Sequence, residues 1–185
     1  ANTTFFINTD GEDANNSNGH VNSFLADGFN VDAGAGGNTN ENNEDYVSWN
    51  WNAGGSTVTN STGTISAQVR VNATAGFSII SWTGNATAGA TIGHGLGVAP
   101  QVAIVKRRIG ASDWHVNLGL IFGSGKDGHY LKLNDNGTEG TQNGPFNSTN
   151  PSSTVITLGS DSDTNVNGGG MMCYAFSEVA GYSKF

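Results

Sequence analysis

The sequence contains very little cysteine and no long apolar run. Its 185 residues include one cysteine, Cys173, so an internal disulfide and a multi-cysteine metal site are both excluded. That cysteine lies in the apolar stretch MMCYAF, where a cysteine usually packs as a small buried hydrophobe. Because no run of about 18 apolar residues occurs, we expect no insertion into a membrane.

Charged residues are also few, and most of them are acidic. Charged residues make up 12% of the chain, the formal net charge is −8, and the pI is near 4.6. An acidic surface repels the phosphate backbone of DNA and RNA, so nucleic acid is not an expected partner. The one basic cluster, Lys106-Arg107-Arg108, directly follows the apolar run Val102–Val105, and we interpret it as the solvated end of a strand.

Helical periodicity is missing, whereas short alternating patterns recur between segments rich in glycine, which occurs 28 times. Residues 64–72 alternate apolar and polar side chains, which predicts a half-exposed strand. Further strands are predicted in YVSWNW (46–51), FSIISW (77–82), QVAIV (101–105), DWHVNLGLIF (113–122), HYLKLN (129–134), TVITLG (154–159) and MMCYAFSEV (171–179). FSIISW and QVAIV are apolar on both faces, which is typical of central strands. The predicted fold is all-β, an antiparallel β-sandwich or jelly-roll-like fold.

Internal matches predict a partial tandem repeat. FFINTDGEDANNSNGHVNS, from Phe5, can be laid on YLKLNDNGTEGTQNGPFNS, from Tyr130, and DYVSWNWNAGG then matches GMMCYAFSEVAG at an offset of about 126 residues. We therefore expect residues 1–54 to be the second half of a preceding unit, 55–75 a linker and strand, 76–180 a complete unit, and 181–185 the start of another. The alternative is that a sequence rich in Asn and Gly matches itself through composition alone.

His94 stands in the glycine-rich stretch ATIGHGLGVAP. A catalytic histidine needs an orienting partner and a nucleophile or substrate, and neither this stretch nor any G-x-S-x-G motif supplies them. Gly93, Gly95 and Gly97 permit positive φ angles, and Pro100 fixes the chain before the next strand. We interpret the stretch as a structural turn in which the imidazole bonds to loop backbone, and we predict no catalytic residue and no enzyme.

One acidic loop resembles a calcium site in spacing. Asp161, Asp163 and Asn165 lie two residues apart, as calcium-binding oxygen ligands often do, but Val166 and Met172 replace the glycine and glutamate of a calcium loop. We favour a polar inter-strand loop and keep calcium as the alternative. The four histidines form no H-x-H or H-x-x-x-H pair, so neither zinc nor any other cofactor is predicted.

The four tryptophans are the remaining candidates for binding. Trp49, Trp51 and Trp114 share faces with aliphatic residues, and we expect them in the core. Trp82 ends a predicted strand beside the turn TGNATAG and is the candidate for stacking on a glycan. A sandwich-fold glycan hydrolase would need paired carboxylates, and no predicted strand carries two acids at alternating positions.

Several coinciding motifs carry a family resemblance. They are AGFSIISWTGNATAGATIGHGLGVAPQVAIVKRR, the strand DWHV, LKLNDNGTEGT and the closing YAFSEVAGYSKF. Together they resemble a repeat domain of tail and virion structural proteins of bacteriophages, particularly marine ones, over Ala75–Phe185. The earlier FNVDAGAGG and DYVSWNWNAGG look like the end of the repeat that precedes it.

The resemblance implies a non-enzymatic, β-rich building block of a tail fibre, spike or capsid appendage in the virion. It implies other virion proteins and further copies of the chain as partners, with a trimer as the expected oligomer, and contact with host-surface polysaccharide. It supplies no catalytic residues. Two alternatives stay open: a secreted or cell-surface carbohydrate-binding or adhesin repeat of a cellular organism, and a sandwich-fold glycan hydrolase.

Overall fold

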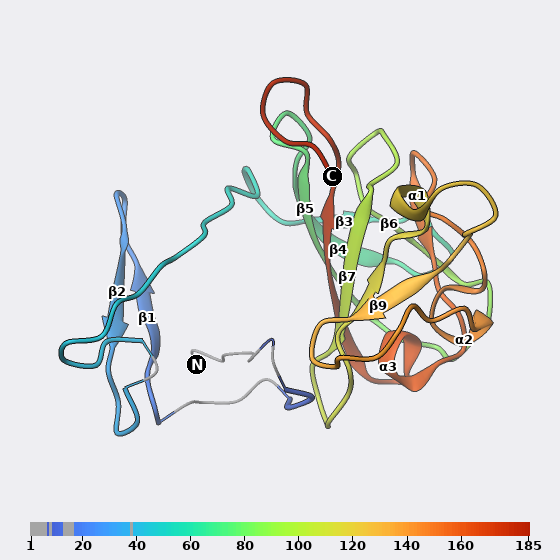
Figure 1. Ribbon diagram of the computed structural model, residues 1–185. Helices are drawn as coiled ribbons and strands as arrows, with labels where there is room; N and C mark the ends of the chain where they lie inside the picture. The colour runs from blue at the N-terminus through green and yellow to red at the C-terminus, as the bar shows by residue number, and fades with distance from the viewer. Residues whose placement is uncertain (1–6, 8, 13–16, 38) are drawn as a thin grey trace.

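The computed structural model of the protein describes residues 7, 9–12, 17–37 and 39–185 (Figure 1). Within these residues the strands are β1 (His20–Phe24), β2 (Phe29–Asp32), β3 (Val58–Asn60), β4 (Ala67–Asn72), β5 (Phe77–Thr83), β6 (Thr91–Gly93), β7 (Val102–Arg107), β8 (His115–Asn117), β9 (Tyr130–Lys132), β10 (Val155–Thr157) and β11 (Gly170–Phe176). The helices, of four residues each, are α1 (Gly119–Phe122), α2 (Asn143–Phe146) and α3 (Ser162–Asn165).

Seven of these strands form one antiparallel sheet in the order β3-β4-β5-β11-β7-β8-β9. The middle of the sheet consists of the most apolar strands, because a strand with neighbours on both edges buries most of its surface. The sequence prediction that FSIISW and QVAIV are central strands is therefore confirmed. On β11, Tyr174 lies opposite Ile79 of β5 and Ile104 of β7, which fixes the register across the three central strands.

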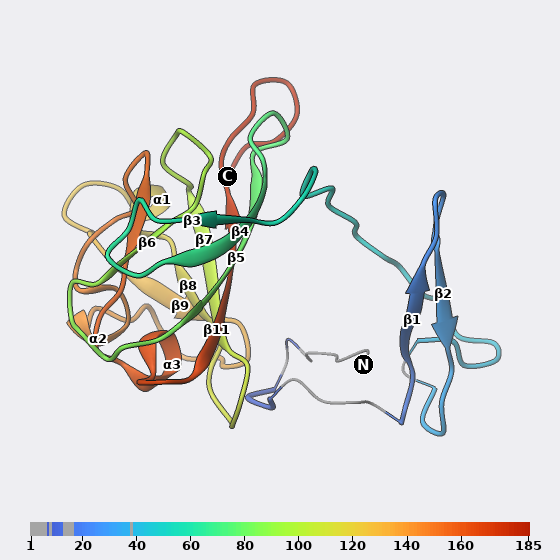
Figure 2. The ribbon, with the colours of Figure 1, turned by 180° about the vertical axis from the view of Figure 1, so that it is seen from behind.

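A smaller layer covers one face of this sheet. Strands β6 and β10 pair antiparallel, and together with α2 they supply Ile92, Ile156 and Phe146 to the core. The opposing side chains of the large sheet include Ile80 and Cys173, which are fully buried, as expected for the cysteine. Figures 1 and 2 show β6 and the short helices on one side of the sheet. The predicted all-β, antiparallel sandwich is confirmed, with a large sheet and a small second layer.

The strands predicted from alternating apolar and polar residues are observed in some segments only. In β4 the buried Ala67 and Val69 alternate with the exposed Gln68 and Arg70, as predicted. In DWHVNLGLIF the strand ends at Asn117, whose side chain accepts a hydrogen bond from the Gly119 backbone and turns the chain into α1. The single long strand predicted there was wrong. The strand predicted in YVSWNW was also wrong, because this segment is extended but pairs with no strand among the described residues.

The N-terminal part of the chain lies beside the sandwich. Strands β1 and β2 form an isolated antiparallel hairpin, and an extended segment leads from it to Ala53, where the chain enters the sandwich (Figure 1). We call residues 20–37 and 39–52 the arm. The predicted boundaries at residues 54, 75 and 180 stay predictions, and the repeat match that begins at Phe5 lies partly outside the described residues.

Candidate functional site

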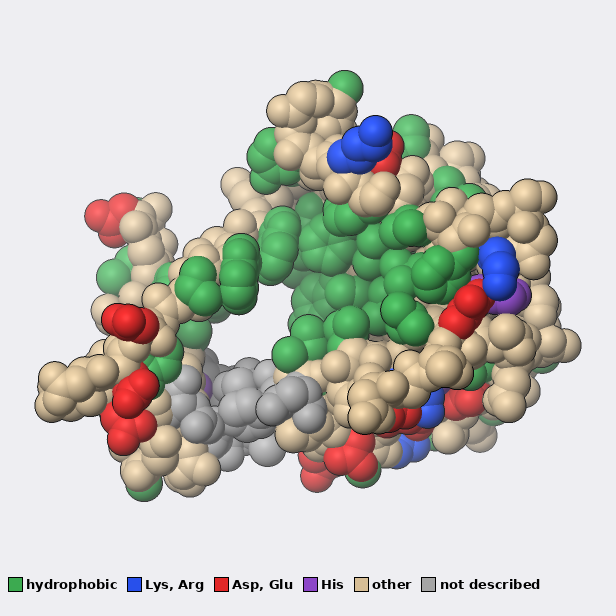
Figure 3. All heavy atoms as spheres, viewed as in Figure 1, with side chains coloured by type: hydrophobic (Ala, Val, Ile, Leu, Met, Phe, Trp, Pro, Cys, Tyr) green, Lys and Arg blue, Asp and Glu red, His purple; other side chains and the backbone are tan. Residues whose placement is uncertain are grey.

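The face of the large sheet turned away from the core carries a continuous apolar surface. Side chains alternate along a strand, so the residues between the core positions of the three central strands all point outward. We call these residues the outer face: Phe77, Ile79, Ile104, Tyr174 and Phe176. Phe77 is buried and the other four are half-buried. Figure 3 shows apolar side chains gathered over these strands.

One residue of the arm packs on the outer face. The ring centroid of Trp51 lies 6.1 Å from that of Phe77 and 5.6 Å from that of Phe176, at the spacing typical of aromatic pairs. The backbone beside Trp51 is held by side chains of β4. Arg70 donates to the Gly54 carbonyl at 3.3 Å, and Asn72 Nδ2 donates to the carbonyl of residue 52 at 3.1 Å.

The rest of the arm leaves the outer face open. Phe24 is 81% exposed, Trp49 71% and Val47 69%. A hollow of about 1170 Å³ lies between the outer face and the arm, lined by Trp49 and Trp51 on one side and by the hairpin turn around Phe24 on another. The prediction that Trp49 and Trp51 lie in the core was wrong, because the two side chains are 71% and 54% exposed and line the hollow.

His94 is buried inside the fold, and both nitrogens of its ring form hydrogen bonds. Its side chain is fully buried, Nε2 donates to the Ser152 carbonyl at 3.2 Å, and Nδ1 accepts from the Leu96 backbone N–H at 3.2 Å. Its own carbonyl accepts from the Ser78 hydroxyl at 2.7 Å. Burial lowers the pKa of His94, because a charged imidazole would lose its hydration.

Two of the three glycines around His94 have the positive φ angle that the sequence predicted. Gly95 and Gly97 adopt φ angles of 76° and 78°, where glycine is favoured. Gly93 has no positive φ, and instead the side chain of Asn60 approaches the position that a Cβ would occupy. Pro100 is buried at the start of the approach to β7.

Asp161, Asp163 and Asn165 have separate structural partners. Asp161 caps α3, with its Oδ1 accepting from the Asp163 backbone N–H at 2.8 Å. Asn165 is fully buried, and its Nδ2 donates to Asn85 Oδ1 and to the carbonyls of Thr87 and Gly159. Among the described residues, no three His, Cys, Asp or Glu side chains are placed to hold a metal ion together.

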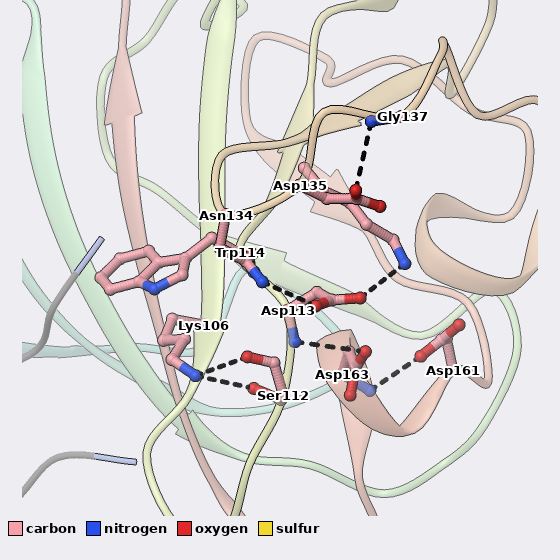
Figure 4. Close-up of polar contacts among 10 residues, drawn as sticks. Lys106, Ser112, Asp113, Trp114, Asn134, Asp135, Gly137, Asp161 and Asp163 are labelled. Atoms are coloured by element: carbon pink, nitrogen blue, oxygen red, sulfur yellow. Dashed lines mark hydrogen bonds and ion pairs between the residues drawn. The ribbon is translucent and has the colours of Figure 1, made fainter. Parts of the chain in front are cut away.

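Sequence reasoning missed a buried lysine. Lys106 is fully buried, not solvated as predicted, and its Nζ donates to the Ser112 carbonyl at 2.7 Å, the Ser112 hydroxyl at 3.1 Å and the Asp10 carbonyl at 3.1 Å. The ammonium lies 5.7 Å from the centroid of the Trp114 ring, within cation–π range. Burial lowers the pKa of Lys106, while Asp10 and Asp163 raise it. Figure 4 shows the lysine reaching Ser112 below Trp114.

Next to the lysine is an ion pair. Asp113 accepts from Lys132 and from Asn134 Nδ2, and these hydrogen bonds lower the pKa of the Asp113 carboxyl (Figure 4). The same contact from Asp113 raises the pKa of Lys132. Both groups therefore stay charged near neutral pH and form an ion pair.

The remaining predicted contact residue lies in the core. Trp82 is 6% exposed and packs among the buried residues between the two layers, so the glycan contact expected at Trp82 was wrong. Position at a strand end suggested exposure, but Val166, which follows α3, packs against the buried cluster that contains Trp82. Trp114 is buried, as expected.

The fold and the site together define an all-β sandwich with a half-buried aromatic sheet face and an exposed apolar arm beside it. A family model described as "Domain of unknown function (DUF7483)" matches residues 1–185, and the chain belongs to this family. Comparison with curated proteins and with solved structures gives no match. No helix within the described residues has the length and apolar character needed to span a bilayer.

Proposed function

We propose that the protein is a non-enzymatic structural module of a bacteriophage virion, a β-sandwich building block of a tail fibre, spike or capsid appendage. Its partners are other virion proteins and further copies of itself, with a trimer as the expected oligomer. The family resemblance of residues 75–185 supplies the assignment to a virion. The observation that supports a role in assembly is the apolar outer face with the exposed arm beside it, since a soluble monomer rarely leaves such a surface uncovered.

The chemistry of the buried polar groups agrees with a structural role. Three fully buried side chains form hydrogen bonds with other groups of the fold through their nitrogen atoms. They are His94, Lys106 and Asn165. Burial also raises the pKa of the Cys173 thiol, which disfavours the reactive thiolate. A nucleophile or general base needs access to a substrate, and these groups lack it.

The test is to ask where the polypeptide is found in its native source. Particles purified on a density gradient should contain its peptides at a constant ratio to the major capsid protein, and antibodies against residues 53–185 should label an appendage in electron micrographs. Antiserum pre-adsorbed with the protein is the control. Detection in particle-free culture medium, with none in the particles, would contradict the proposal.

A secreted or cell-surface carbohydrate-binding repeat is the second candidate, and the exposure of Trp49 and Trp51 favours it. Exposed aromatic rings can stack on sugars, and host-surface glycans are also a proposed contact of the virion module. A glycan array should then show binding that Trp49→Ala abolishes. The glycan hydrolase is tested on the same polysaccharides by the appearance of new reducing ends, which we do not expect.

A further inference from the structure

The chain carries two apolar surfaces that are both incompletely covered. One is the outer face, and the other is the arm, where Val47 and Trp49 are 69% and 71% exposed. Together with Trp51 they alternate along an extended segment that has no strand partner among the described residues. Burying apolar surface drives association, so a partner that covered either surface would gain binding free energy.

The contact of Trp51 shows that the outer face can bind an aromatic side chain. Its ring packs against Phe77 and Phe176 at centroid distances of 6.1 and 5.6 Å, so the face already holds an aromatic side chain from this segment. Trp49 is the same type of residue two positions earlier. The hollow beside it, about 1170 Å³, is bordered by the half-buried Ile79 and Ile104.

The charge distribution decides which pair of surfaces meets. Residues 1–52 contain eight Asp and Glu and no Lys or Arg, whereas residues 53–185 contain seven of each sign. The whole net charge of −8 therefore falls on the part of the chain that includes the arm. Contact between two arms would bring like charges together, whereas an arm on a sandwich meets a neutral partner with Arg70 at the edge of the hollow.

A glycan fits these surfaces less well than protein does. Sugar hydroxyls need hydrogen-bonding side chains around the aromatic ring, because a hydroxyl buried without a partner costs free energy. The outer face offers Phe, Ile and Tyr side chains, and the arm beside Trp49 offers Val47 and Phe24. Apolar contact of this kind is typical of the centre of an interface between protein subunits.

We propose that the arm of one copy, through Val47 and Trp49, docks on the outer face of a second copy. The contact joins two different surfaces, so it is heterologous: it closes a ring when the rotation allows, or otherwise extends into a filament. A ring of three copies would cover every arm and every outer face. The inference deepens the proposed function by naming the contact between modules, and its test uses purified protein alone, so that it can fail independently of the virion assignment.

The test is sedimentation velocity of residues 1–185 from about 1 to about 200 μM. The wild type should show association that strengthens with concentration. Trp49→Ser in the arm and Ile104→Glu on the outer face should each weaken association at least tenfold. Val47→Ser should weaken it several-fold, whereas its matched control, Val98→Ser, should leave it unchanged, because Val98 is 53% exposed but lies outside the arm and the outer face.

Mixing the two variants separates this proposal from any symmetric contact. Trp49→Ser keeps an intact outer face and Ile104→Glu keeps an intact arm, so an equimolar mixture should form a complex with one copy of each. Far-UV circular dichroism reports whether each variant is folded, and Tyr174→Ser replaces Ile104→Glu if the latter is not. A wild type that stays monomeric at every concentration, association unaffected by Trp49→Ser, or a mixture that forms no complex would each overturn the proposal. Loss of glycan binding in Trp49→Ser, with a monomeric wild type, would do the same and assign the arm to sugars.

Discussion

Replacing His94 by alanine tests whether the most conspicuous histidine of the sequence is structural. The substitution removes two hydrogen bonds of the buried ring, one to the Ser152 carbonyl and one from the Leu96 N–H, both at 3.2 Å. A hydrogen bond of this kind contributes about 1 kcal/mol, and the cavity left by a buried ring costs about 1–2 kcal/mol more. We expect the free energy of unfolding to fall by about 3 kcal/mol, which corresponds to about 10 °C in Tm for a domain of this size.

The same variant should change the pH dependence of stability. Burial lowers the folded-state pKa of His94 and of His115 below the ordinary value of 6.5. The unfolded chain therefore binds more protons than the folded chain between that value and the folded-state pKa, and stability falls as pH drops below 6.5. One histidine contributes at most about 1.4 kcal/mol per pH unit. The loss of stability between pH 7.5 and 5.5 should be smaller in His94→Ala than in the wild type by up to about 1.4 kcal/mol.

Urea unfolding followed by circular dichroism at the two pH values measures both effects. His129→Ala is the control, since His129 is partly exposed and pairs with Glu139, and loss of such a pair should cost less than about 1 kcal/mol. A His94→Ala variant as stable as this control, with the pH dependence of the wild type, would refute the structural role of His94.

The other predictions concern the loop at α3 and the cysteine. Asn165→Ala removes an amide that donates to three acceptors, so we expect the free energy of unfolding to fall by about 3 kcal/mol in a urea titration, against no change for the exposed Asn136→Ala. Millimolar calcium should leave Tm unchanged by calorimetry, because Asp161 and Asn165 already have partners within the fold; a rise of several degrees would restore the calcium interpretation. Cys173 should be silent to a thiol reagent in the native protein and react fully in urea, because it is fully buried and its pKa is raised; fast native labelling would contradict its place in the core.

The sequence predicted those parts of the fold that depend on neighbours along the chain. Alternation in residues 64–72 and the apolar runs around Ile80 and Val105 identified β4, β5 and β7, because a side-chain period of two is a local property of a strand, although β4 itself begins only at Ala67. The turn at His94 could be predicted for the same reason, because its glycines are neighbours in the sequence. Glycine indicates where a positive φ angle is possible, and Gly95 and Gly97 adopt one, whereas Gly93 does not.

What the sequence could not predict depends on residues far apart in the chain. Lys106 is buried because the carbonyl of Asp10 and the groups of Ser112 surround its ammonium, and no local pattern places Asp10 there. Trp49 alternates with polar residues as a buried strand residue would, yet it lacks a partner strand within the described part of the chain. Periodicity identifies an apolar face but not the surface that will cover it. For Trp49 we propose that this surface belongs to another copy.

Iodide quenching of tryptophan fluorescence tests the central claim, that neighbouring copies cover the arm. Trp82 and Trp114 are 6% and 4% exposed and are shielded from iodide, whereas Trp49 and Trp51 are 71% and 54% exposed, so quenching reports on the arm. The account predicts that the quenchable fraction falls as the protein is concentrated from about 1 to about 200 μM, and that Trp49→Ser removes most of this change. Equal quenching at both concentrations would show that the arm stays open and would contradict the account.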